Sequence, residues 1–154
     1  MTSVLFVCSG NTCRSPLAEA LAREEARRRG LAVRVGSAGT FASPGGAAAD
    51  LAVRVARGRG ADLRGHRARS LSAELVGEAD VVVGMTPAHL AAVHRVARGV
   101  TRTLLATDVL PLGHPSHGRP IPDPFGADLE AYERVADLLE ECISALLDEI
   151  GVTE

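Results

Sequence analysis

The sequence predicts an α/β domain built on a mostly parallel sheet, and two observations carry that prediction. Apolar strand-like runs alternate with amphipathic helical stretches along the 154 residues, the pattern of parallel strands joined by helices. The run Val81-Val82-Val83 is also continuous and β-branched, which is typical of a strand covered on both faces. We therefore expect one domain over residues 1–154, with helices flanking the sheet.

The first three elements are a strand at residues 4–7, a helix at residues 15–29 and a strand at residues 31–37. Ser15 followed by Pro16 is the pattern of an N-cap residue with proline at the first helical position. Gly30 then marks the helix end. Because a helix separates the two strands, they are expected to run parallel.

The later elements follow the same alternation. Helices are expected at residues 50–57, near residues 72–77, from Thr86-Pro87 to about Ala97, and at residues 128–150; strands are expected at residues 79–85 and 101–107. An irregular arginine-rich connection spans residues 58–69, and Cys142 falls on the apolar stripe of the last helix. Residues 107–126 hold five of the eight prolines and show no periodicity, which indicates a loop that is either functional or disordered.

Composition excludes several classes of protein. A net charge of −2 does not favour binding to nucleic acid or to an acidic membrane, and no apolar run has the length of a membrane span. Three cysteines, an odd number, argue against a disulfide framework, and no export signal begins the chain, so we expect a cytoplasmic protein. We also expect it to be a monomer. His114 and His117 lack neighbouring ligands, so we expect no metal.

The short loop between the first strand and the first helix carries the chemistry. It begins at Cys8 and ends at Arg14, where a helix N-terminus directs backbone N–H groups inward and creates an anion site. Amides and a guanidinium favour the thiolate form of a cysteine. This layout indicates a cysteine-dependent phosphatase: Cys8 attacks phosphorus and forms a thiophosphate, while Arg14 stabilises the phosphoryl oxygens. The alternative is a buried small cysteine and a surface arginine.

Four further residues fit this chemistry. Asp123, held extended by Pro124, is the candidate general acid/base; the alternative is an ordinary Asp-Pro turn. Phe41 and Phe125 lie in polar loops and are predicted to form walls of a cleft, with core packing as the alternative. Ser15 is expected both to cap the helix and to hydrogen-bond Cys8.

Two segments carry a family resemblance. Residues 7–19, with the core Cys8-Ser9-Gly10-Asn11-Thr12-Cys13-Arg14-Ser15-Pro16, and Asp123-Pro124-Phe125 resemble the low-molecular-weight protein tyrosine phosphatases. Gly-Asn-Thr-Cys-Arg-Ser-Pro together with residues 37–44 is similar to the bacterial protein arginine phosphatase branch. The resemblance implies a four-stranded parallel sheet, phosphorylated protein substrates and no cofactor. The implied phosphate-binding loop comprises Ser9, Gly10, Asn11, Thr12, Cys13 and Ser15.

The resemblance also implies roles for residues other than the nucleophile. Ser37 and His66 match positions of a hydrogen-bond network that supports the phosphate loop. Cys13 matches a thiol that can form a reversible disulfide with Cys8 and so protect it. Thr12 is the selector: tyrosine phosphatases carry a bulky aliphatic residue at this position, whereas the arginine branch carries threonine, which implies a preference for phosphoarginine.

Three alternatives stay open at this point. The same fold acting on phosphotyrosine is the nearest. An arsenate reductase would need relay cysteines after the third strand, and residues 79–94 contain none. A non-catalytic phosphoprotein-binding module would be expected to lose the nucleophile or the acid, and this chain keeps both.

Overall fold

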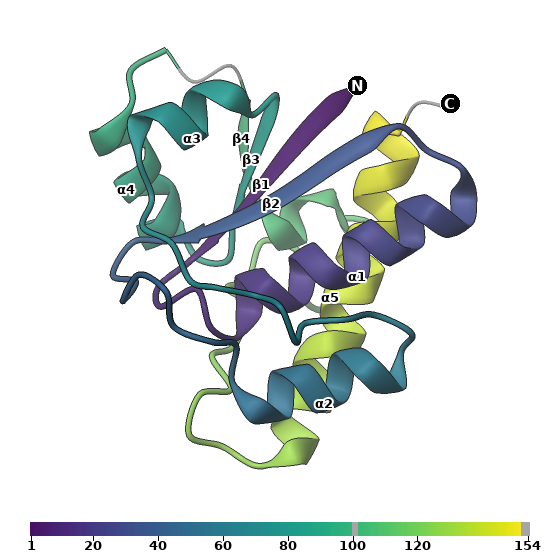
Figure 1. The fold of residues 1–154 in the computed structure, drawn as a ribbon. Coiled ribbons are helices and arrows are strands. Elements are labelled where there is room, and N and C mark those ends of the chain that lie inside the picture. Colours follow the sequence, from purple (N-terminus) through teal and green to yellow (C-terminus); the bar gives the residue numbers. More distant parts are fainter. Residues whose placement is uncertain (100–101, 152–154) are drawn as a thin grey trace.

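A four-stranded parallel sheet forms the centre of the computed structural model, which describes residues 1–99 and 102–151 (Figure 1). The strand order is β2-β1-β3-β4, so the first strand lies inside the sheet. The strands are β1 (Thr2–Cys8), β2 (Val33–Gly39), β3 (Val81–Gly84) and β4 (Thr103–Leu105). All three strand pairs are parallel, so the predicted α/β class and four-stranded sheet are confirmed.

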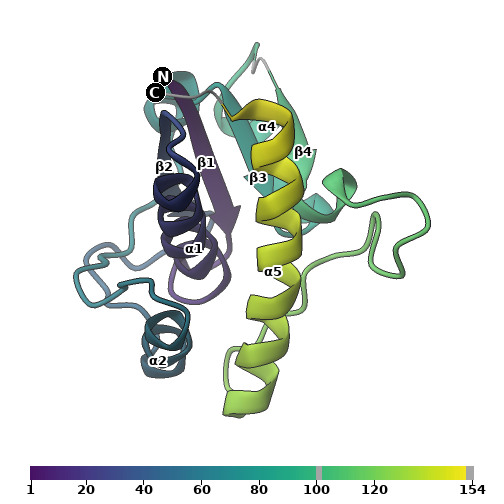
Figure 2. The ribbon, with the colours of Figure 1, turned by 90° about the vertical axis from the view of Figure 1, so that its right-hand side faces the viewer.

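The helices form a layer on each face of the sheet. On one face α1 (Arg14–Arg29) and α5 (Leu129–Ile150) lie side by side, and α2 (Asp50–Gly58) packs against both (Figures 1 and 2). The short α3 (Ala73–Glu78) and α4 (Pro87–Val96) cover the other face. This places two separate apolar cores on either side of one sheet.

Alternate residues of the central strands enter the two cores. Val4 and Phe6 pack with α1 and α5, whereas Leu5 and Val7 pack with the α3–α4 layer. Successive side chains of a strand point to opposite faces, so a strand buried on both faces must be apolar at every position. This explains the uninterrupted apolar runs in β1 and β3.

Most helix ends follow the sequence signals. Gly30 ends α1 in the left-handed conformation (φ 66°), and the Thr86 and Asp128 side chains accept N–H groups at the starts of α4 and α5. The prediction that Ser15 caps α1 is wrong: the helix begins at Arg14 and has no side-chain cap. The Ser15 hydroxyl instead bonds other side chains of the phosphate loop.

All four strands differ from their predicted ranges. β1 extends beyond residues 4–7 at both ends, and β3 is shorter than residues 79–85 because Ala79 still caps the end of α3. The second strand runs over Val33–Gly39 rather than residues 31–37, because Leu31 still donates to the carbonyl of Ala26 and completes the end of α1 (2.9 Å). In the last strand, β4 stops at Leu105 and a 3₁₀ turn, η1 (Ala106–Val109), follows. The first residue predicted for it, Thr101, lies outside the described residues.

The last helix matches its predicted amphipathic pattern. Cys142 is buried on its inner face, as expected. Across residues 1–99 and 102–151, no helix is both long enough and apolar enough to cross a membrane.

Candidate active site

A cavity of about 400 Å³ opens beyond the carboxyl ends of β1 and β2. Three loops meet there: the Cys8 loop, the loop after β2 and the proline-rich loop. Their lining residues are Cys8, Ser9, Gly10, Thr12, Cys13, Arg14, Phe41, Ser43, Gly46, Asp123 and Phe125. The structure thus brings together the residues predicted for attack, phosphate binding and acid/base transfer.

Ser15 holds the sulfur of Cys8. Their Oγ and Sγ atoms are 2.8 Å apart in a buried contact. The Ser15 oxygen also accepts a hydrogen bond from the Asn11 amide (2.8 Å), which leaves the hydroxyl hydrogen free for sulfur. Ser15 is therefore the donor to a Cys8 thiolate, and this half of its predicted role fits the geometry.

Asn11 is the centre of the network behind the loop. It is fully buried and adopts the left-handed conformation (φ 55°), which Asn tolerates better than most residues. Its two amide hydrogens go to Ser15 and Ser37 (2.8 and 2.9 Å), and its side-chain oxygen accepts the backbone N–H of Arg69 (3.0 Å). His66 Nε2 lies 2.8 Å from the Asn11 carbonyl, so Ser37 and His66 lie where the resemblance implied.

Two members of this network were not predicted. Ser37 donates to the Glu19 carboxylate (2.6 Å), and Arg69 Nε donates to the Ser37 carbonyl (2.8 Å). Glu19 also forms an ion pair with Arg23, four residues further along α1. Nothing in the irregular connection at residues 58–69 singles out Arg69.

Gly39 is required where β2 passes the phosphate loop. A Cβ atom at this position would come within 2.5 Å of the Ser9 carbonyl oxygen and 2.9 Å of the Asn11 nitrogen. The same carbonyl of Ser9 accepts the N–H of Phe41 (2.9 Å). The backbones of the two loops are therefore in direct contact, and only glycine fits between them.

Arg14 joins the phosphate loop to the proline-rich loop. Although charged, it is 5% exposed, and its guanidinium donates to the Ile121 carbonyl (3.1 Å). Ile121 is buried and donates to the Met85 carbonyl after β3 (2.9 Å). Two residues further on, the Asp123 carboxylate lies 3.6 Å from Arg14 and is about half exposed at the cavity.

Phe41 and Phe125 stand at the mouth of the cavity. They are 85% and 72% exposed, which excludes core packing, and both line the cavity. Phe125 is placed by its own N–H, which donates to the Asp123 carboxylate (3.1 Å). Both aromatic side chains are therefore available as cleft walls, as the sequence indicated.

Cys13 lies on the inner side of the loop. Its sulfur is 3.3 Å from the hydroxyl of Tyr132 on α5, a contact that the sequence did not reveal. Burial raises the pKa of Cys13 and also that of Tyr132. Cys8 and Cys13 are both free thiols in the structure.

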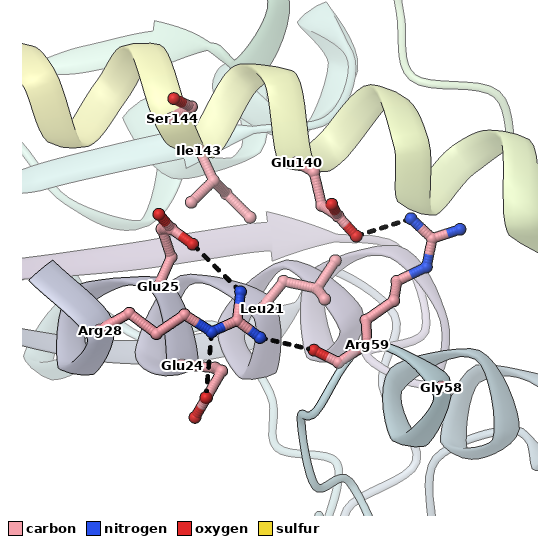
Figure 3. A pocket seen from close by; sticks show the side chains of 9 residues that line it. All are labelled: Leu21, Glu24, Glu25, Arg28, Gly58, Arg59, Glu140, Ile143 and Ser144. Carbon is pink, nitrogen blue, oxygen red and sulfur yellow. Dashed lines mark hydrogen bonds and ion pairs between the residues drawn. The ribbon is translucent and has the colours of Figure 1, made fainter.

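A larger cavity, about 520 Å³, lies away from this chemistry between α1, α2 and α5 (Figure 3). Its charged groups are already paired with one another: Arg28 bonds Glu24, Glu25 and the Arg59 carbonyl, and Arg59 bonds Glu140. This network ties α2 to its neighbours and leaves no unpaired group aimed at a ligand. The smaller cavity is therefore the candidate active site.

The two histidines of the proline-rich loop bind protein groups. His117 Nδ1 lies 2.8 Å from the Leu110 carbonyl, and His114 Nε2 lies 3.1 Å from Glu141. Within the part of the chain that the structure describes, no three His, Cys, Asp or Glu side chains gather as a metal site would require.

One further buried polar residue reaches the phosphate loop. His89, in the first turn of α4, is 4% exposed, and its Nε2 atom lies 2.9 Å from the Ser9 hydroxyl. The sequence signal was the Thr86-Pro87 helix start, which places residue 89 at the third helical position. Nothing in the sequence linked it to Ser9, 80 residues earlier.

Comparison with known proteins agrees with this geometry. A family model described as low molecular weight phosphotyrosine protein phosphatase matches residues 3–153. The chain belongs to this family. The prediction made from the motifs is confirmed: the chain is a cysteine-dependent protein phosphatase.

The names of individual relatives give two different substrates, phosphorylated arginine and phosphorylated tyrosine. The protein-arginine-phosphatase of Bacillus subtilis (strain 168) is 38% identical over 147 residues, covering 96% of this chain and 95% of the relative. The low molecular weight protein-tyrosine-phosphatase Etp of Escherichia coli (strain K12) is 36% identical over 139 residues, with 90% and 87% covered. A solved mutant of the YwlE arginine phosphatase, with a phosphorylated active-site serine, has a TM-score of 0.87 at 37% identity, covering 96% and 95%.

Proposed function

We propose that this phosphatase hydrolyses phosphoarginine on proteins. The observation that carries the proposal is that a hydroxyl and a carboxyl group, from Thr12 and Asp123, line the same cavity as Cys8. A guanidinium presents several N–H donors, and these two side chains offer acceptors for them. The similarity to a relative named protein-arginine-phosphatase supports the same substrate.

In the first step Cys8 acts as the nucleophile. Its thiolate forms a bond to phosphorus while the phosphorus–nitrogen bond of phosphoarginine breaks, and Asp123, protonated, gives its proton to the departing nitrogen. Arg14 and the loop N–H groups stabilise the phosphoryl oxygens during transfer. The products of this step are an unphosphorylated arginine side chain on the substrate protein and a thiophosphate on Cys8.

In the second step water replaces sulfur. Asp123, now a carboxylate, takes a proton from the water as the water oxygen bonds to phosphorus and the phosphorus–sulfur bond breaks. The electron pair returns to Cys8, whose thiolate accepts the hydrogen bond of Ser15 at 2.8 Å. Ser15 thus stabilises the leaving group of this step.

Phosphotyrosine is the second candidate substrate. The exposed rings of Phe41 and Phe125 beside the cavity suit a flat phenol, and the relative Etp is named a tyrosine phosphatase. The planar guanidinium also stacks on aromatic rings, so the two walls alone do not choose between substrates. The choice depends on Thr12.

Arsenate reduction is disfavoured by the third thiol. Cys142 is buried in the α5 core, and burial raises its pKa to about 12, so it is a poor candidate for a disulfide relay. The cytoplasmic location, the monomeric state and the Cys8–Cys13 disulfide stay predictions.

The test is kcat/KM on a phosphoarginine protein and on a phosphotyrosine peptide. Wild type is expected to prefer phosphoarginine, and Thr12→Ile to reverse the preference by replacing a hydroxyl with an aliphatic wall. Thr103→Ile in β4, outside the cavity, is the matched control and should change neither value. Cys8→Ser should abolish turnover.

A wild-type preference for phosphotyrosine would reject the substrate assignment and keep the mechanism. Turnover by Cys8→Ser would reject the mechanism itself.

A further inference from the structure

His89 is held by both of its ring nitrogens. Nδ1 lies 3.1 Å from the backbone nitrogen of Thr86, and the Thr86 hydroxyl accepts the N–H of His89 in return (3.4 Å). This reciprocal pair caps the start of α4, with histidine in the position usually taken by Glu or Gln. The other nitrogen, Nε2, contacts the Ser9 hydroxyl (2.9 Å).

The cap fixes which nitrogen carries the proton. A backbone N–H can only donate, so Nδ1 must offer its lone pair, and the hydrogen of the neutral ring resides on Nε2. Burial, followed by the positive charge of Arg14, lowers the pKa of His89 to about 4, although the Asp123 carboxylate opposes the shift. The neutral ring therefore donates its Nε2–H to Ser9 at ordinary pH.

Because His89 is the donor in this hydrogen bond, the hydroxyl hydrogen of Ser9 remains available for another acceptor. With its oxygen accepting from His89, its own hydrogen is not needed for that contact. Ser9 lines the cavity beside Cys8, and its carbonyl is fixed by the N–H of Phe41 (2.9 Å). The hydroxyl hydrogen is thus free to turn toward a group bound in the cavity.

We propose that His89 is a positioning residue for the phosphatase reaction. By donating to Ser9 Oγ, it directs the Ser9 hydroxyl hydrogen toward a phosphoryl oxygen of the substrate, adding a side-chain donor to the backbone amides of the loop. The α3–α4 layer thereby contributes to the site from the face of the sheet opposite α1 and α5. The inference rests on the proposed function only in that the phosphoryl group binds in the Cys8 loop.

The experiment measures two quantities for a set of variants: the dissociation constant of inorganic phosphate by titration, and kcat/KM on the better substrate. Ser9→Ala and His89→Leu are each expected to weaken phosphate binding about tenfold, the effect of one lost hydrogen bond to a charged group. The double variant should be no worse than Ser9→Ala alone. His94→Leu, on the same helix but exposed, with its ring bonded to Thr103 in β4, is the matched control.

His89→Gln is the conservative variant. Its side-chain oxygen can accept the Thr86 N–H as in an ordinary capping box, while its NH₂ group donates to Ser9. It is expected to restore phosphate binding close to the wild-type value. A role in capping alone would change thermal stability in His89→Leu and leave the phosphate constant of the folded protein unchanged.

Several outcomes would overturn the proposal. They are unchanged phosphate binding in Ser9→Ala, unchanged binding in His89→Leu, or additive losses in the double variant. If His89→Leu does not fold, the ring nitrogens of wild-type His89 are observed by ¹⁵N NMR, and a hydrogen on Nδ1 instead of Nε2 rejects it. Phosphate binding does not depend on which phosphorylated residue is the substrate, so this proposal and the phosphoarginine assignment fail separately.

Discussion

Two of the three loops that form the candidate active site are built in opposite ways. In the phosphate loop, residues 8–15, the central side chain of Asn11 is fully buried and uses every hydrogen-bonding group. In the proline-rich loop, residues 107–126, most side chains are exposed. Its buried anchors include Thr107, which donates to the Arg119 carbonyl within the loop, and Ile121, which donates to the Met85 carbonyl after β3. Phosphoryl transfer needs fixed donors, whereas a general acid/base must serve a leaving group and then a water.

The comparison predicts that Asp123 contributes to catalysis and little to stability. Asp123→Asn removes the transferable proton, so kcat should fall by about 10² to 10⁴-fold. Because the carboxylate is half exposed and its ion pair with Arg14 is long (3.6 Å), the free energy of unfolding should change by less than about 0.5 kcal/mol. Steady-state kinetics and urea denaturation measure the two effects.

Asp50→Asn, an exposed carboxylate in the first turn of α2, serves as the control for Asp123→Asn. It should leave kcat unchanged. A large loss of stability in Asp123→Asn would mean that the proline-rich loop is held by this carboxylate and not by its buried anchors.

Asn11 should show the opposite balance. Asn11→Ala leaves buried partners without bonds and places a Cβ residue with no polar side chain at φ 55°, so the free energy of unfolding should drop by about 3 kcal/mol. Activity should fall about 100-fold, because the loop donors lose their fixed positions. Chemical denaturation and kcat/KM give the two numbers.

Asn11→Gly separates the two causes in that prediction. Glycine accepts the left-handed backbone and restores none of the hydrogen bonds. If it recovers most of the lost stability, strain at φ 55° and not the buried network is what makes Asn11 important.

The pH dependence of stability tests whether His89 is buried and neutral in the folded protein, like the Asn11 side chain of the phosphate loop. Its pKa is about 4 in the folded protein against 6.5 as the ordinary value, so between these limits the unfolded chain binds a proton that the folded chain does not. Stability should therefore fall as the pH falls, and His89 should account for about 2 kcal/mol between pH 7 and pH 5. Urea denaturation at both pH values compares wild type with His89→Gln.

Other groups titrate in the same range and affect both proteins alike. The loss of stability in His89→Gln should therefore be smaller than in wild type by the His89 share. Equal losses would show that the histidine titrates normally in the folded chain.

The sequence was sufficient for the part of the site that lies in one strand–loop–helix unit. Apolar β1, the polar loop and the helix start place Cys8, Arg14 and Ser15 within a few residues of one another, and parallel strands bring their carboxyl ends to one edge. For Asp123, Phe41 and Phe125 the sequence predicted roles at the site but left an ordinary turn and core packing open as alternatives, and the structure places all three at the cavity.

The site residues that the sequence did not reveal reach the phosphate loop from elements distant in the chain. Arg69 and His89 reach the loop from segments 58 and 80 residues away, and their meeting depends on strand register and helix placement. The prediction that Ser15 caps α1 was wrong for a different, local reason. Its hydroxyl has partners in Asn11 and Cys8, and the loop, not a capping side chain, fixes the start of α1.

A substitution of Phe125 in the proline-rich loop has the smallest expected effect, and this effect is confined to substrate binding. Phe125→Ala removes an exposed wall of the cavity, so KM should rise about fivefold, equivalent to about 1 kcal/mol of aromatic contact. Stability should not change, because a side chain 72% exposed contributes little burial. Leu112→Ala, in the same loop, 87% exposed and outside the cavity, is the matched control. An equal rise of KM in both variants would mean that the loop as a whole, and not the ring of Phe125, contacts the substrate.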